Sequence, residues 1–271
     1  MTANFSLNRL GKLIVKQWVE HRRLYLVSTL ALLGLLGIIF MIWLSTTGDY
    51  FDENSLYVTG LFGLFITGSI FAGTTFNMLG AKDKGIYWIS FPASHAEKLF
   101  TQLFFNVIVF TIVYACCFFL LKTLMEAYIN FLVESDPSTY TFKRVNWKKV
   151  DGSGDMMPIF VSAFFAVQAA FLLGSVAFKR YAIIFTLIIV AVIFFSYIFY
   201  LSKISNYYFK GFNFELFKLE SYHYANSELK ETYKEYFVSP VLRETLVFFM
   251  KYLIAPFLWL ITWFKLKEKQ I

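Results

Sequence analysis

Six long apolar runs, separated by polar segments, dominate the amino-acid sequence. Each run has about 20 residues or more, enough for a helix to cross a hydrocarbon core of roughly 30 Å. The runs are apolar all round instead of along one stripe, which is typical of helices that do not face water. The sequence therefore predicts an all-α integral membrane protein with six transmembrane helices, at Leu24–Leu44, Leu56–Leu79, Leu99–Leu121, Met157–Phe178, Tyr181–Leu201 and Thr245–Phe264.

The segments that flank the runs predict a further helix and two outer loops. Apolar residues recur at helical spacing between residues 5 and 22, with basic residues elsewhere on the wheel, so residues 1–23 are expected to form an amphipathic interfacial helix. The alternative is a basic segment without helical structure of its own, which only satisfies the positive-inside rule. The remainder, 24–271, is expected to be one transmembrane domain with outer loops at 122–156 and 202–244. The first loop is polar and rich in turn residues, and we expect it to be exposed.

Aromatic residues are dense in the second outer loop, where they alternate with Lys and Glu between Tyr207 and Phe237. That density is not typical of disorder. We expect short helices at the outer membrane interface, one of them at Glu228–Tyr236 with Ser227 as its cap.

Charge gives the expected orientation. Only 16% of the residues are charged, against about 25% in an average soluble domain. Lys and Arg are densest near span ends on the side of the N-terminus, whereas the short loop between the first and second spans, on the opposite side, has no basic residue and only Asp49, Asp52 and Glu53 as charged residues. The positive-inside rule therefore places both termini in the cytoplasm. The net charge of +7 lies beside spans, so we expect anionic lipids, and not nucleic acid, as the neighbours.

The N-terminal segment has no signal-peptide cleavage pattern, so Leu24–Leu44 is expected to remain as an anchor. Glycine and threonine crowd the second span, and such small residues allow close helix packing. Three roles are open for this face: packing within the chain, a subunit contact, or the wall of a translocation path.

The chemistry that the spans allow is narrow. They contain no Asp, Glu or His apart from acids at their edges, and the sequence has no His-Glu-x-x-His, Walker A, dinucleotide or Cys/His metal motif. Cys116 and Cys117 are adjacent within one span and are expected to be lipid-facing or packing thiols. We therefore expect no enzyme activity in this chain. The polar exceptions inside spans are Asn106, Gln168 and Lys251. They either line a path or serve in packing, through an interhelical hydrogen bond for the two amides and through snorkelling for the lysine.

The most informative polar stretch is Gly80–Lys98, GAKDKGIYWISFPASHAEK, which joins the second and third spans. Ser94 followed three residues later by Glu97 is a capping box, and it predicts the start of a helix. An aromatic-rich loop on the cytoplasmic side is expected to lie on the membrane or beneath a partner protein.

This stretch resembles the inner loop of bacterial type-2 ABC transporter permeases, in which a charged segment leads to a Leu-Pro-Ala-Ser-like motif and then Glu-Lys. Phe91 stands here where leucine is common in the family. The layout is similar as well: an N-terminal interfacial helix, six spans, a coupling loop between spans two and three, and a structured outer segment before span six.

The resemblance implies that the chain is the membrane-spanning permease subunit of an ATP-driven exporter in the bacterial cytoplasmic membrane. A separate cytoplasmic ABC ATPase would bind ATP, a second permease chain, alike or different, would complete the path, and this chain would hold no cofactor. The N-terminal helix would flank the ATPase contact. The coupling residues would be Lys82, Asp83, Lys84, Tyr87, Trp88, Phe91, Pro92, Ser94, Glu97 and Lys98.

Two other hypotheses remain from the sequence. The chain is alternatively a non-transporting polytopic scaffold or immunity-type protein that acts through its outer aromatic loop. An uncoupled channel or secondary carrier is the third hypothesis, and the lack of acids within the membrane argues against it.

Overall fold

The computed structural model describes residues 5–80, 93–144, 156–178, 180–208, 212–215, 218–221, 234–237 and 248–268, together with 241 and 245. Its α-helices are α1 (Leu7–Thr47), α2 (Glu53–Thr74), α4 (His95–Leu103), α5 (Phe110–Ser135), α6 (Met156–Ala177), α7 (Ala182–Tyr208) and α9 (Ile254–Glu268). The described residues also include two π-helical turns, η2 (Phe104–Val109) and η4 (Phe249–Leu253), and the 3₁₀ turn η1 (Asn77–Gly80).

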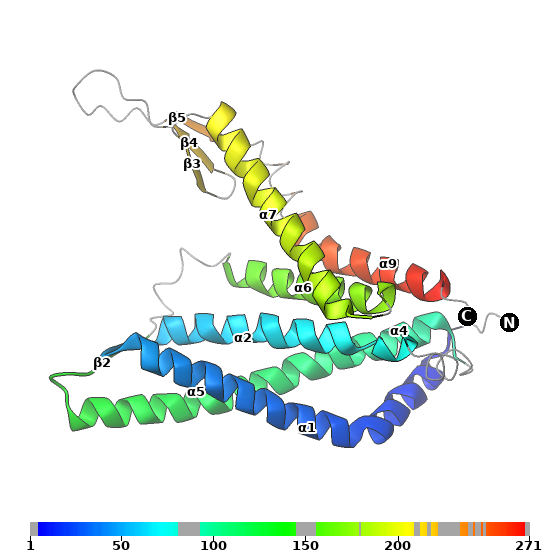
Figure 1. Ribbon diagram of the computed structural model, residues 1–271, viewed down its shortest axis with the longest axis horizontal. Coiled ribbons are helices and arrows are strands. Elements are labelled where there is room, and N and C mark those ends of the chain that lie inside the picture. The colour runs from blue at the N-terminus through cyan, green and yellow to red at the C-terminus, as the bar shows by residue number, and fades with distance from the viewer. Residues whose placement is uncertain are drawn as a thin grey trace.

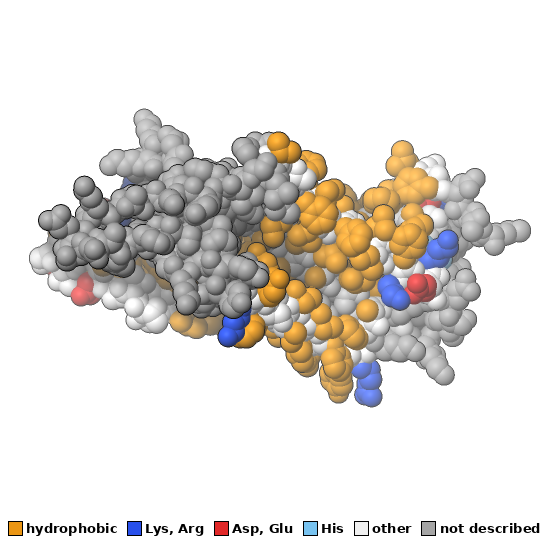
Figure 2. Space-filling view, turned by 90° about the horizontal axis from the view of Figure 1, so that it is seen from above, with side chains coloured by type: hydrophobic (Ala, Val, Ile, Leu, Met, Phe, Trp, Pro, Cys, Tyr) orange, Lys and Arg blue, Asp and Glu red, His pale blue; other side chains and the backbone are white. Residues whose placement is uncertain are grey.

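Six helices in the described residues are long and apolar enough to cross a membrane. The sequence prediction of an all-α fold with six spans is confirmed at this level, and the helices indicate a multi-pass membrane protein. On the face seen in Figure 2, hydrophobic side chains cover much of the described part, and several charged side chains lie toward its right-hand end. Apolar side chains on the outside of a bundle are what lipid, in contrast to water, accommodates without cost.

The helices α1, α2, α5, α6 and α9 run side by side, whereas α7 leaves the bundle at an angle (Figure 1). The first turn of α1, the start of α4 and the end of α9 all lie at one end, which we call the loop end. The strands β1 (Tyr50–Asp52) and β2 (Thr141–Lys143) pair in parallel at the opposite end, the strand end.

Helix α1 differs from the two units expected from the sequence. It is one unbroken α-helix of 41 residues that includes both the predicted interfacial segment and the first span. Figure 1 shows that its first, darkest part runs in a different direction from the rest. Leu10 and Ile14 of the predicted apolar stripe are partly buried, whereas Leu7 and Trp18 are exposed. Whether this part lies in the headgroup plane stays a prediction.

Helix α2 is central, because it contacts α1, α5, α6 and α7. Four of its glycines lie where a neighbouring side chain approaches the helix closely. A Cβ at Gly60 would meet Phe118, and a Cβ at Gly63 would meet Leu36 and Tyr114. A Cβ at Gly68 would meet Phe164, and a Cβ at Gly73 would meet Ile183. Of the three roles left open for the small residues of the second span, these glycines therefore have the first, packing within the chain.

Two hydrophobic clusters occupy the bundle. One lies between α1, α2 and α5 around Leu36, Phe40 and Phe118, and the other between α2, α6 and α9 around Ala72, Leu172 and Leu266. At the strand end, Lys122 Nζ of α5 lies 3.0 Å from Glu53 Oε1 of α2 and 2.6 Å from Glu126 Oε1.

The first outer loop was predicted to begin at residue 122, and this boundary is wrong. Helix α5 continues to Ser135, because Met125 and Ile129 repeat at helical spacing and are buried in the first cluster. The charged residues between Met125 and Ile129 and around them hide this helical spacing in the sequence. Helices α6 and α7 form a hairpin, because they are in contact and are separated by residues 178–181 alone.

The second outer loop contains strands where short helices were predicted. Strands β3 (Phe212–Glu215), β4 (Lys218–Ser221) and β5 (Lys234–Phe237) pair as an antiparallel sheet in the order β3-β4-β5. The predicted helix Glu228–Tyr236 is therefore wrong where it overlaps β5, and its other residues lie outside the described residues. Alternation of apolar and polar residues, as in Phe212-Asn213-Phe214-Glu215, has the period of a strand.

Candidate functional site at the start of the third span

Helix α4 begins at a capping box, as the sequence predicted. The Ser94 hydroxyl oxygen accepts a hydrogen bond from the Glu97 backbone N–H at 3.2 Å, and the Glu97 carboxylate accepts one from the Ser94 N–H at 2.9 Å. Both exchanges satisfy donors that the start of a helix leaves without an intrahelical partner. The box fixes where the polypeptide enters the third span.

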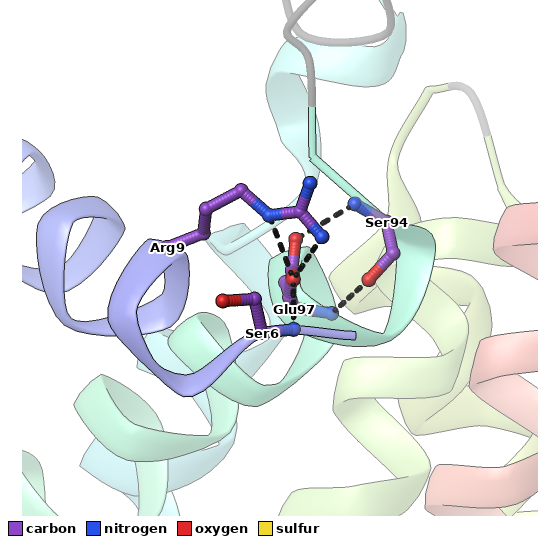
Figure 3. A network of polar contacts seen from close by, with 4 residues as sticks. All are labelled: Ser6, Arg9, Ser94 and Glu97. Atoms are coloured by element: carbon purple, nitrogen blue, oxygen red, sulfur yellow. Dashed lines mark hydrogen bonds and ion pairs between the residues drawn. The ribbon is translucent and has the colours of Figure 1, made fainter. Parts of the chain in front are cut away.

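The Glu97 carboxylate also holds the first turn of α1 (Figure 3). Its Oε1 accepts a hydrogen bond from the Ser6 backbone N–H at 2.7 Å, and from Arg9 Nη2 and Nε at 3.1 and 3.3 Å. Ser6 and Arg9, which precede Glu97 by 91 and 88 positions in the chain, thus both bind its carboxylate. We call Ser6, Arg9, Ser94 and Glu97 the Glu97 clamp.

Because Glu97 is buried, its carboxylate depends on the partners that the clamp supplies. Glu97 is completely buried, whereas the Arg9 side chain is 40% exposed. A buried carboxylate needs both a positive partner and hydrogen bonds to its oxygens, since it has lost its hydration. The clamp supplies one guanidinium and two backbone N–H groups. The start of α4 and the start of α1 are therefore expected to move as one unit.

Positive charge surrounds the same end of α4. Lys98 is 5% exposed, and Lys267 lies near the end of α9, which contacts α4. His95 Nδ1 is buried and has no hydrogen-bond partner among the residues that the structure describes. Helix α4 therefore begins where it contacts both α1 and α9.

A second polar layer lies one turn deeper. Gln17 of α1 and Gln102 of α4 exchange side-chain amide hydrogen bonds of 3.2 and 3.0 Å, and Gln17 also donates to the Tyr25 hydroxyl at 3.0 Å. The Tyr25 ring stacks between Trp18 and Phe105. This layer repeats the link between α1 and the third span, so the clamp does not act alone.

The predicted coupling residues fall into two groups. Ser94 and Glu97 meet in the clamp, and Lys98 is buried beside it. The other group lies outside the described residues, and its proposed role stays a prediction: Lys82, Asp83, Lys84, Tyr87, Trp88, Phe91 and Pro92.

The polar residues within the spans also separate. Asn106 and Gln168 are both 2% exposed and are joined by a hydrogen bond between η2 and α6. Lys251 lies in the π turn η4, away from these two in the chain, and is partly buried. The geometry thus brings together the two amides that were predicted either to line a path or to pack.

Nothing in the sequence pattern pointed to Ser6, Gln17 or Gln102, or to the pairing of Arg9 with Glu97. No local spacing connects residues of α1 with residues of α4. The one available signal was Glu97 itself: a capping-box carboxylate uses few of its lone pairs, so its others require donors from elsewhere in the fold.

The hydrogen bonds and the ion pair of the clamp fasten Ser94 and the start of α4 to the start of α1. Among the described residues, no group of three or more His, Cys, Asp or Glu side chains has the arrangement to hold a metal ion.

Comparison of the chain with protein-family models, with curated proteins and with solved structures found no match.

Proposed function

We propose that this chain is the membrane-spanning permease subunit of an ATP-driven exporter, and that a separate ABC ATPase docks on Gly80–Lys98. The observation that carries the proposal is the Glu97 clamp. A force on the segment that ends at Ser94 would pass to α4 and to the start of α1 together, because a fully buried carboxylate joins them. A coupling element requires this rigidity.

The proposed contact has two parts. Lys82, Asp83 and Lys84 supply polar contacts, and the aromatic residues that follow fill a groove on the ATPase. ATP is bound by the partner subunit, and a second permease chain completes the path. The chain lies in a bacterial cytoplasmic membrane with both termini and the coupling segment in the cytoplasm. The common position of the start of α1, the start of α4 and the end of α9 supports this topology.

Purification from membranes of the source organism tests the proposal. We expect the tagged chain to retain an ATPase subunit in stoichiometric amount, with ATP hydrolysis in the purified complex. Charge reversal K82E/K84E is expected to weaken that complex at least about tenfold, which corresponds to about 1.4 kcal/mol of binding free energy.

The matched control is K143E/R144E, the same double reversal on exposed residues at the strand end, where the complex is expected to persist. A monodisperse chain that transports without any ATPase would contradict the proposal. An equal loss of complex in K143E/R144E would assign the effect to net charge.

A non-transporting scaffold or immunity-type protein is the second candidate. It is favoured by the outer segment, in which three stretches pair into one antiparallel sheet that offers edges to a partner. Deletion of residues 207–237 would then abolish the biological effect, while K82E/K84E would leave it unchanged. The permease proposal expects the loop substitutions to have the larger effect.

A further inference from the structure

The third span is interrupted by the π turn η2, between α4 and α5. A π turn contains one residue more than the α-helical path would use, and it leaves a backbone carbonyl without its α-helical donor. Phe110 N–H donates to the Phe105 carbonyl across this turn. In lipid, each freed carbonyl must find another donor.

Gln168 supplies that donor from another helix. Its Nε2 donates to the Asn106 backbone carbonyl at 2.6 Å, and both residues are nearly completely buried. The π turn is thus stabilised by α6, and not by the third span alone.

Other polar atoms around η2 lack a full set of hydrogen-bond partners among the described residues. The Thr75 hydroxyl has one hydrogen but two acceptors at 3.1 Å, the Phe71 carbonyl and Asn106 Oδ1. Gln168 Oε1 is buried and has no hydrogen-bond partner among the described residues. A network with more buried acceptors than donors gains from a second arrangement, since unsatisfied buried polar atoms are costly.

The π turn also separates two mechanical units. On one side, α4 is fastened to α1 by the clamp and contacts α9; on the other side, α5 packs against α1 and α2 in the first hydrophobic cluster. Closing the turn to an α-helix would advance α4 relative to α5 by about 1.5 Å and rotate it by up to about 100°.

We propose that η2 is a hinge within the third span and that Gln168 holds it in its π-helical form. Release of the Asn106 carbonyl by Gln168 allows the turn to re-register, so that α4 moves while the span stays helical. That this movement carries force from an ATPase rests on the proposed function; the hinge itself does not.

Deletion of one residue tests the hinge. Removing the exposed Ile108 from η2 leaves a chain that can continue as an α-helix with both flanks on their present faces, so ΔIle108 is expected to fold with a melting temperature near that of the unaltered protein. Removing Ile112, equally apolar and exposed but within α5, rotates everything that follows and is expected to prevent folding.

Gln168→Met supplies the second arm. It removes the donor to Asn106 while preserving length, and is expected to lower the melting temperature of the full-length chain in detergent. In ΔIle108 the carbonyl has a helical donor again, so the same substitution is expected to cause less than half that shift. If Gln168→Met alone does not fold, folding of the double variant decides in favour of the hinge; failure of both overturns it.

Spin labels at exposed positions 100 and 128, in a Cys116→Ser/Cys117→Ala background, report the movement without nucleotide or partner. We expect Gln168→Met to displace the distance distribution by several ångströms, and ΔIle108 to abolish that displacement. An unchanged distribution in Gln168→Met, or ΔIle108 unfolding as ΔIle112 does, overturns the hinge. Because the chain is measured alone, these results are independent of whether an ATPase partner exists.

Discussion

Glu97→Ala is expected to lower the free energy of unfolding by about 3 kcal/mol, the cost of removing one partner from a buried ion pair. The substitution deletes the acceptor of two backbone N–H groups and of the Arg9 guanidinium, and leaves a space where α1 meets α4. The first turns of α1 should detach. Thermal melting in detergent measures the loss, and hydrogen exchange over residues 6–23 locates it.

Glu268→Ala is the matched control. Glu268 also pairs with a basic residue, Lys265 at 2.6 Å, but its side chain is 64% exposed. Exposed pairs contribute about 1 kcal/mol or less, so this variant should melt close to the unaltered protein, with no change in exchange at the N-terminus. Equal shifts in Glu97→Ala and Glu268→Ala would show that the clamp adds nothing beyond surface charge.

Gly174→Ala is expected to destabilise the hairpin of α6 and α7 by about 1–3 kcal/mol. A Cβ at this position would overlap the Thr186 hydroxyl, which donates at 2.7 Å to the Ala182 carbonyl. Threonine has few rotamers in a helix, so the overlap is relieved only if the two helices separate. The melting temperature in detergent reports the effect.

Gly34→Ala provides the comparison, because no heavy atom lies within 4 Å of the added methyl group on α1. It should be neutral or slightly stabilising, since alanine favours a helix over glycine. Thr186→Ala combined with Gly174→Ala should recover part of the loss. A Gly174→Ala protein as stable as Gly34→Ala would mean that the two helices are not closely packed.

The parts of the fold predictable from sequence were those set by local pattern. Apolar runs of spanning length gave the six helices, and the spacing of Ser94 and Glu97 gave the start of α4. Each of these signals lies within a single element. The apolar composition of a run is enough to predict a spanning helix, and the hydrogen bonds of a capping box are enough to predict where a helix starts.

Features that depend on contacts between distant segments were not predictable. Arg9 and Glu97 meet only because α1 and α4 pack at the same end, and nothing in the spacing of the sequence encodes that meeting. No residue pattern in the third span marks the π turn at Asn106, since the donor that stabilises it comes from Gln168 in another helix. The sheet of the outer loop was missed because its alternating pattern was outweighed by its aromatic content.

In the proposed complex, an ATP-binding subunit touches the segment before α4. A photo-crosslinking amino acid at position 84 tests it directly in membranes of the source organism, with one at position 139, exposed beyond the end of α5, as the control. We expect one crosslinked partner from position 84 that is labelled by azido-ATP, and none from position 139. The absence of an ATP-binding adduct at position 84, or the same adduct from position 139, would contradict it.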